Sequence, residues 1–99
     1  MKVEVSDTAR TDIVDILEWT IWNFGPQQAL VYRDGLFNAF GLIEDNPRMG
    51  QVAFHLSGGR EIRRLIYRMH YIFYELAETK ITIATIRHTR QALPEGWSR

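Results

Sequence analysis

The stretch HYIFYELAETKITIATIRHTRQ, residues 70–91, decides the fold. Residues 70–76 and 80–87 are rich in aromatic and β-branched side chains, which favour strands, and the polar residues 77–79 between them indicate a turn. Two such strands joined by a short turn form an antiparallel hairpin. The run Arg87-His88-Thr89-Arg90 closes the stretch, so positive charge is expected at one end of the sheet.

The residues before this hairpin continue the strand pattern. Residues 61–67 have the same aromatic and β-branched character, and a turn at residues 68–69 connects them to the hairpin. A shorter strand is predicted over residues 52–56, followed by a turn at Ser57-Gly58-Gly59.

Two amphipathic helices are predicted in the first half of the chain. Ser6 followed by Asp7 is a suitable helix start, Gly25 ends the first helix and Pro26 suits the first turn of the second. Proline at position 47 closes the second helix. Three- and four-residue steps place Ala9, Ile13, Ile16, Leu17, Thr20 and Phe24 on one stripe, and Ala29, Tyr32, Leu36, Ala39, Phe40 and Ile43 on another.

The order of elements predicts an α+β fold. Residues 2–5 alternate as a short N-terminal strand, an antiparallel helical hairpin follows, and a mainly antiparallel sheet completes the chain with the helices on one side. At 99 residues, we expect a single domain over residues 1–99. No apolar run approaches the roughly 18 residues of a membrane span, and no secretory signal is recognisable, so we expect a cytoplasmic protein without membrane contact.

The composition gives no indication of a metal or cofactor. The chain has no cysteine, and its three histidines, at positions 55, 70 and 88, lack the spacing of a metal site. It also has no glycine-rich phosphate loop and no GxSxG nucleophile motif. We therefore expect no metal, no cofactor and none of the common enzyme classes.

Charge is distributed unevenly although the formal net charge is zero. Residues 1–59 hold four basic and eight acidic side chains, whereas residues 60–99 hold eight basic and four acidic ones. This asymmetry indicates an anionic partner for the second half, or else two elements that use different charges for solubility.

The predicted sheet is apolar on both faces. Alternation puts Tyr71 and Phe73 opposite Ile72 and Tyr74, and it puts Leu65 and Tyr67 opposite Ile62 and Ile66. Two helices can cover only one face. The second face needs either a lid from the chain's own loops and tail, to which Trp97 could contribute, or a partner protein.

Two tryptophans fall outside the predicted helix core. Trp22 lies almost opposite the apolar stripe of the first helix, and Trp19 lies at its edge. Packing against the second helix or a loop would account for Trp19. A protein contact is at least as suitable for Trp22, because tryptophan is enriched among interface anchors.

Arginines gather at two places that an antiparallel sheet could bring together. We predict an anion site, for nucleic acid or another target, formed by Arg60, Arg63 and Arg64 on one strand and by Arg87, His88 and Arg90 at the end of another. The alternative is a solvated edge in which Glu61 and Glu75 neutralise the arginines. His88 is the one histidine set among arginines, and so the one candidate for acid-base catalysis of RNA cleavage.

Several segments resemble the RelE/ParE toxin superfamily of type II toxin-antitoxin systems, and the likeness spans nearly the whole chain. They are SDTARTDIVDI, FGPQQALVYRDGL, NPRMGQ, LSGGREIRRL and HYIFYELAETKITIATIRHTRQ, in that order. The resemblance implies a toxin neutralised by a cognate antitoxin whose disordered segment folds around it. Such a partner would cover the free sheet face and the exposed tryptophan, and we predict antitoxin contacts at Trp22, Leu65, Tyr67, Tyr71 and Phe73.

The resemblance leaves two branches with different activities. ParE-like toxins inhibit DNA gyrase without being enzymes, whereas RelE-like toxins cleave mRNA on the ribosome. Arg87 and His88 match the basic strand end of the superfamily, but Tyr71 stands where RelE has an arginine, and neither tyrosine nor lysine follows Arg90. The longer helical hairpin also resembles ParE, so the sequence favours a gyrase inhibitor, with a ribosome-dependent endoribonuclease as the alternative.

Overall fold

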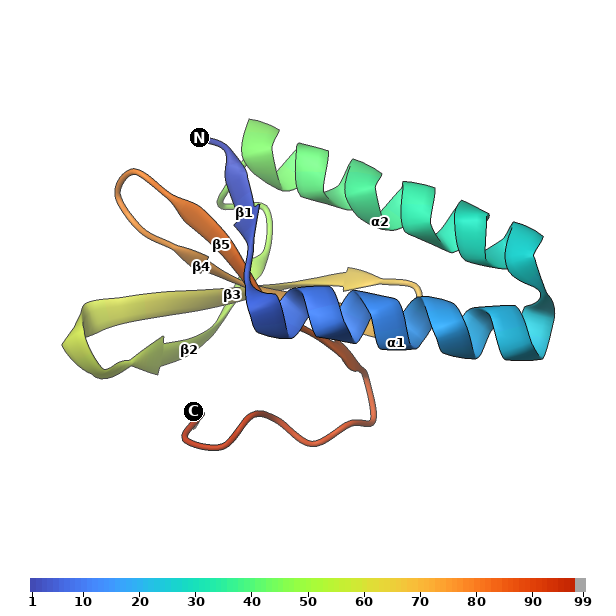
Figure 1. Cartoon of the computed structure of the whole chain (residues 1–99). Helices are drawn as coiled ribbons and strands as arrows, with labels where there is room; N and C mark the ends of the chain where they lie inside the picture. The colour runs from blue at the N-terminus through green and yellow to red at the C-terminus, as the bar shows by residue number, and fades with distance from the viewer. Residues whose placement is uncertain (98–99) are drawn as a thin grey trace.

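The helical hairpin forms where two amphipathic segments meet at a glycine. The computed structural model describes residues 1–97, and in it helix α1 spans Asp7–Phe24 and helix α2 spans Pro26–Asp45 (Figure 1). The Ser6 hydroxyl accepts a hydrogen bond of 3.0 Å from the Ala9 N–H and caps α1. Gly25 links the helices with φ +92°, a conformation that side chains disfavour, so the reversal depends on glycine.

The predicted fold class is confirmed by a five-stranded sheet that follows the hairpin. Its strands are β1 (Val3–Val5), β2 (Gln51–Leu56), β3 (Arg60–Tyr67), β4 (His70–Leu76) and β5 (Ile81–His88). They lie in the order β1-β5-β4-β3-β2, and every neighbouring pair is antiparallel except β1 with β5. The helical hairpin therefore carries the chain from one edge of the sheet to the other. Within the described residues, neither helix is apolar over a length that would cross a bilayer.

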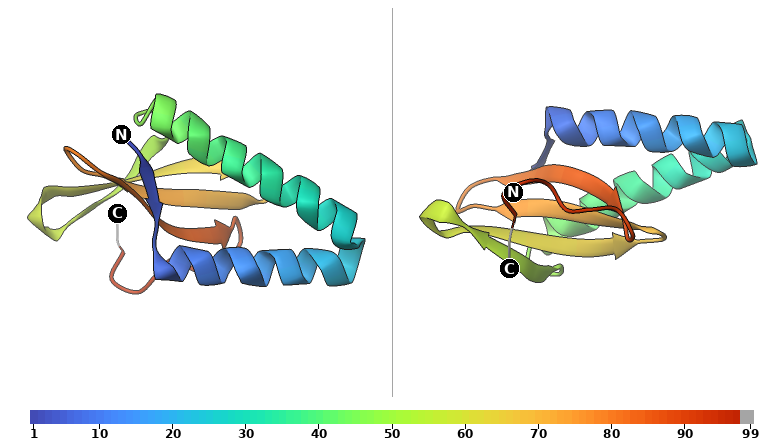
Figure 2. Two further views of the ribbon diagram at one scale, coloured as in Figure 1. Left: turned by 45° about the horizontal axis from the view of Figure 1, so that its top comes forward. Right: turned by 90° about the horizontal axis from the view of Figure 1, so that it is seen from below.

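The main core lies between the helices and one face of the sheet. Figure 2 shows the helices on this side and the tail after β5 on the other. The buried side chains of this core are Ala9, Ile13, Tyr32, Leu36, Ala39, Phe40, Ile43, Ile72, Tyr74, Ile81, Ile83 and Ile86. Nearly all of the predicted helix stripes are in this set or packed against it, since periodicity reports directly which side of a helix is buried. Thr20 and Ala29 are buried outside this set, whereas Phe24 lies at the end of the hairpin and stays 64% exposed.

A buried tyrosine holds the loop between α2 and β2. The Tyr74 hydroxyl donates to the Pro47 carbonyl at 2.7 Å and accepts from the Gly50 N–H at 2.9 Å. A Cβ atom on Gly50 would lie 2.7 Å from this hydroxyl, so the close approach requires glycine. Burial raises the pKa of Tyr74, and the group stays protonated as the donor that the loop needs.

A β-bulge changes the direction of the last side chains of β5. Phe73 pairs with Thr85 and Tyr74 with Ile83, so Ala84 is an extra residue in β5. The Asp12 carboxylate of α1 supports the bulge, accepting from the Thr85 hydroxyl at 2.5 Å and from the Ile86 N–H at 2.9 Å. As a result Ile86 and His88 face the helices, and Arg87 faces the opposite side.

The face away from the helices has a small core of its own. Phe54, Ile62 and Phe73 are buried there, and the Trp97 ring packs with centroids 5.6 Å from Phe54 and 5.3 Å from Phe73. The sequence left two alternatives for covering this face, the chain's own loops and tail or a partner protein. Around Phe73 the chain's own tail covers it. Farther along the face Ile66 remains 60% exposed.

One grouping from the sequence is corrected. Leu65 and Tyr67 pack against the helix-side core, and they do not share a face with Tyr71 and Phe73. The Tyr67 hydroxyl donates to the Tyr32 carbonyl of α2 at 3.0 Å. Both faces of β3 are apolar, so alternation separates the two sets without indicating which one meets the helices.

Candidate target and partner surfaces

Two arginines meet beside an aromatic ring on the face away from the helices. The Arg64 guanidinium carbon lies 4.9 Å from the centre of the Tyr71 ring, and Tyr71 pairs across the sheet with Arg87. With the tail after β5 they border a pocket of about 200 Å³, here called the two-arginine pocket. No carboxylate among residues 1–97 forms an ion pair with Arg64 or Arg87. The pocket therefore presents positive charge that an anionic group could neutralise.

Local hydrogen bonds orient the second of these arginines. The Arg87 Nη1 donates to the Ala92 carbonyl at 2.9 Å, and its Nε donates to the Thr85 hydroxyl at 3.3 Å. Arg87 thereby ties the tail to the bulged strand. Its position depends in turn on the contact between Thr85 and Asp12.

The other predicted arginines do not belong to this pocket. Arg60 pairs with Glu75, Nη2 to Oε1 at 2.5 Å, and Arg63 pairs with Glu61, Nε to Oε1 at 2.5 Å. Arg63 also donates to the Gly50 carbonyl at 2.7 Å. The prediction of one continuous cluster is thus corrected: for these two, the alternative of carboxylate partners describes the structure. Arg60 lies at the far end of β3, and Arg63 points to the face opposite that of its neighbour Arg64, because successive side chains of a strand alternate.

His88 borders the two-arginine pocket, but its ring packs on the helix side against His70, with centroids 5.5 Å apart. The Arg90 N–H donates to the His88 Nδ1 at 3.1 Å. A neutral ring whose Nδ1 accepts a hydrogen bond carries its hydrogen on Nε2. In this conformation neither ring nitrogen of His88 is free to remove a proton. Arg90 itself is exposed.

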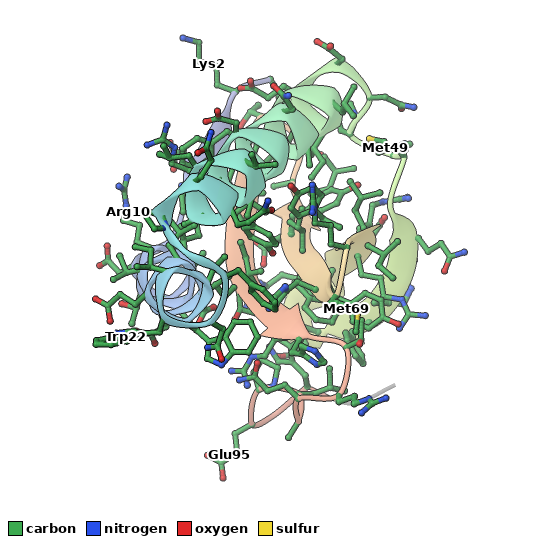
Figure 3. All side chains as sticks on the ribbon, turned by 90° about the vertical axis from the view of Figure 1, so that its right-hand side faces the viewer. Lys2, Arg10, Trp22, Met49, Met69 and Glu95 are labelled. Carbon is green, nitrogen blue, oxygen red and sulfur yellow. The ribbon has the colours of Figure 1, made fainter. Side chains whose placement is uncertain are left out.

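The predicted antitoxin contacts differ in accessibility. Trp22 is 88% exposed and points away from the sheet (Figure 3). Tyr71 is half-buried, whereas Phe73 is 1% exposed beneath Trp97. Leu65 and Tyr67 are turned toward the helices. Of the five predicted antitoxin contacts, the chain itself therefore leaves two accessible away from the helix-side core, Trp22 and Tyr71.

A larger pocket lies at the free end of the hairpin and was not predicted. This tip pocket, about 420 Å³, is lined by Trp19, Thr20, Phe24, Gln28, Tyr32, Arg68, Met69, His70 and His88. Burial, and then the neighbouring His88, lower the pKa of His70. One sequence signal for the tip pocket was the position of Trp19 at the edge of its helix stripe. The approach of the two histidines could not be predicted, because it depends on the β-sheet register.

Metal-ligand groupings are also missing from the part of the chain that the structure describes. No set of three or more histidine, cysteine, aspartate or glutamate side chains in residues 1–97 is placed to hold a metal ion.

The helical hairpin on a five-stranded, mainly antiparallel sheet is the α+β arrangement expected from the resemblance to RelE/ParE toxins. Residues 3–93 match the family described as ParE toxin of type II toxin-antitoxin system, parDE. The chain therefore belongs to the ParE toxin family.

Comparison of structures agrees on the fold. The chain is similar to a solved chain described as the chromosomal ParDE TA system from P. aeruginosa, with a TM-score of 0.73 and 18% sequence identity. The match covers 89% of this chain and 95% of that chain. A search among curated proteins found no match.

Proposed function

We propose that this ParE-family toxin arrests growth by inhibiting DNA gyrase through direct contact in the cytoplasm, and that a cognate antitoxin neutralises it. The observation that carries the proposal is the family match over residues 3–93. The absence of a free general base at His88 supports contact over catalysis, because inhibition by contact needs complementary charge but no proton transfer.

The two-arginine pocket is the proposed target surface. Arg64 and Arg87 have no carboxylate partner among residues 1–97, so they can form charge-assisted hydrogen bonds with an acidic group of the target. Exposed Arg90 extends the same positive surface. Arg60 and Arg63, which already have carboxylate partners, are left out of this proposed set.

Gyrase assays with purified protein test this proposal. We expect loss of supercoiling and accumulation of cleaved DNA complexes. Arg64→Ala and Arg87→Ala should each weaken inhibition by about 10- to 100-fold, the scale of losing a charged hydrogen bond of about 1.5–3 kcal/mol. Arg60→Ala is the matched control and should retain inhibition. Unimpaired supercoiling at saturating toxin would refute the gyrase target.

Antitoxin binding is proposed on the surfaces that the chain leaves exposed, with Trp22 as the anchor. Trp22→Ala should weaken binding to the cognate antitoxin without changing inhibition of gyrase, since Trp22 points away from the sheet and its two-arginine pocket. Co-expression growth assays and calorimetry measure the two properties separately. Full neutralisation of the Trp22→Ala toxin would exclude the proposed anchor.

A ribosome-dependent endoribonuclease is the second candidate, and the same two arginines favour it. Guanidinium groups flanking an aromatic ring could hold a phosphate and a base of single-stranded RNA. If RNA cleavage uses His88, its Nδ1 must first lose the hydrogen bond from the Arg90 N–H.

Primer extension on ribosome-bound mRNA separates the two candidates. Cleavage that falls about 10²- to 10⁴-fold in His88→Ala would establish the enzyme. Intact mRNA together with inhibited gyrase would support inhibition of gyrase by direct contact.

A further inference from the structure

The tip pocket has the composition of a ligand site. Three large apolar side chains line it and are also exposed, namely Trp19, Phe24 and Met69, at 59%, 64% and 56%. Its volume of about 420 Å³ lies within the range of about 300–1,000 Å³ typical of small-molecule sites. Exposed apolar side chains that surround one pocket offer a flat apolar group more burial than single side chains scattered over a surface.

Polar groups inside the pocket are held in a connected arrangement. The Tyr32 hydroxyl and the His70 Nδ1 are 2.9 Å apart, and the ring of His88 stands edge-on to His70. Burial raises the pKa of Tyr32, which therefore remains a hydroxyl. Because the Arg90 N–H occupies the His88 Nδ1, the Nε2 of His88 is a hydrogen-bond donor.

The charge of the pocket selects the kind of ligand. Arg68 lines it, and none of its described lining residues carries a carboxylate. The hydrogen bonds at both Nδ1 atoms also argue against a metal between the histidines, since a metal at the His88 Nε2 would need the hydrogen on Nδ1 where the Arg90 N–H already donates. A cationic, donor-rich pocket with apolar walls suits a ligand that is apolar at one end and anionic at the other.

We propose that the tip pocket binds an aromatic acid, with the ring against Trp19, Phe24 and Met69 and the carboxylate toward Arg68 and the His88 Nε2–H. This binding is separate from the inhibition of gyrase and from the antitoxin surface at Trp22. Two sources share the chemistry: a free aromatic acid, or the C-terminal aromatic residue of a peptide.

Matched ligands test the charge preference by NMR on the full chain. Indole-3-acetate and tryptamine share an indole ring and differ in the sign of charge. We expect indole-3-acetate to bind at least about 10-fold more tightly, equivalent to about 1.4 kcal/mol. The indole N–H signal of Trp19 should shift saturably, whereas the signals of outward Trp22 and of Trp97 on the other face should not. Equal affinities, or saturable shifts at Trp22 or Trp97 in place of Trp19, would overturn the proposal.

Variants locate the site and a peptide identifies the source. Arg68→Ala and Trp19→Ala should each lower the affinity at least about 5-fold, with Arg60→Ala and Trp22→Ala as matched controls that retain it. A tripeptide Ala-Ala-Trp with a free carboxylate that binds more tightly than indole-3-acetate would indicate a protein C-terminus, and the reverse order a free acid. Failure of both to bind, or equal losses in the control variants, would contradict the site.

Discussion

The two faces of the sheet differ in how many side chains they bury and in the charged groups they present. On the helix side, twelve buried side chains form one core, and polar groups such as the Tyr74 hydroxyl are satisfied within the chain. On the other side, three buried side chains are closed by one tryptophan of the tail, and two arginines lack carboxylate partners among residues 1–97. The comparison indicates that the first face supplies the stability, while the second is free to carry binding groups.

The largest expected effect comes from truncating the helix-side core. Ile83 is fully buried, so Ile83→Ala should lower the free energy of unfolding by about 2–5 kcal/mol through lost burial and a cavity. Ile66→Ala on the other face is the control, and we expect a change within about 0.5 kcal/mol because that side chain is mostly exposed. Urea unfolding followed by circular dichroism measures both, and equal losses would remove the distinction between the faces.

The bulge that determines which face of the sheet Arg87 and His88 each occupy can be tested at Asp12. In Asp12→Ala the Ile86 N–H and the Thr85 hydroxyl lose their acceptor, which should cost about 1–3 kcal/mol. Nuclear Overhauser contacts between the His70 and His88 rings should also weaken as the register relaxes. The Asp12→Asn variant keeps one acceptor oxygen, so its free energy of unfolding should lie between those of the parent and of Asp12→Ala. Unchanged ring contacts in Asp12→Ala would show that other contacts hold the bulge.

The tail's contribution to the second face should be smaller. Trp97→Ala removes two aromatic pairs worth about 0.5–1.5 kcal/mol each, so the loss should fall within about 1–3 kcal/mol, in the lower part of that range because Trp97 is only partly buried. Amide exchange near Phe73 should become faster. Trp22→Ala removes a tryptophan that is almost fully exposed, and its melting temperature should match that of the parent. A parent-like Trp97→Ala variant would mean that the tail does not shield this face.

The smallest effect is a pH dependence on the helix side. Burial lowers the folded pKa of His70 below its unfolded value of about 6.5, so its contribution to stability is present above that pH and is lost as the pH falls. His70→Gln should flatten this part of the stability curve between about pH 7 and pH 5. The exposed His55 provides the control variant, His55→Gln, which should follow the parent curve. Parallel curves for His70→Gln and the parent would exclude this linkage.

Most of the element boundaries were predictable, because apolar periodicity and the positions of glycine, proline and other turn residues indicate local structure. Gly25 and Pro47 marked the helix ends, and the strands begin and end within about one residue of their expected positions. The position of Trp22 opposite its helix core was also predictable, since only the 3.6-residue repeat decides it.

The surfaces were harder to predict because they depend on register between distant segments. Strict alternation along residues 81–88 would put Arg87 on the same face as Ile83, and the bulge at Ala84 reverses this. The separation of Arg63 from Arg87 and the approach of His70 to His88 likewise follow from pairing in the sheet. No single segment contains that information.

The pairing of the first strand with the last has a consequence for biosynthesis. Val3–Val5 can join the sheet only beside Ile81–Ile83, so a nascent chain cannot complete its tertiary structure until β5 has left the ribosome. Until then helix α1 lacks strand β5, against which it packs, although β2, β3 and β4 can already pair with one another. Translation therefore delays the mature toxin until its last strand is released, and during that interval the emerging helices are open to capture by other proteins.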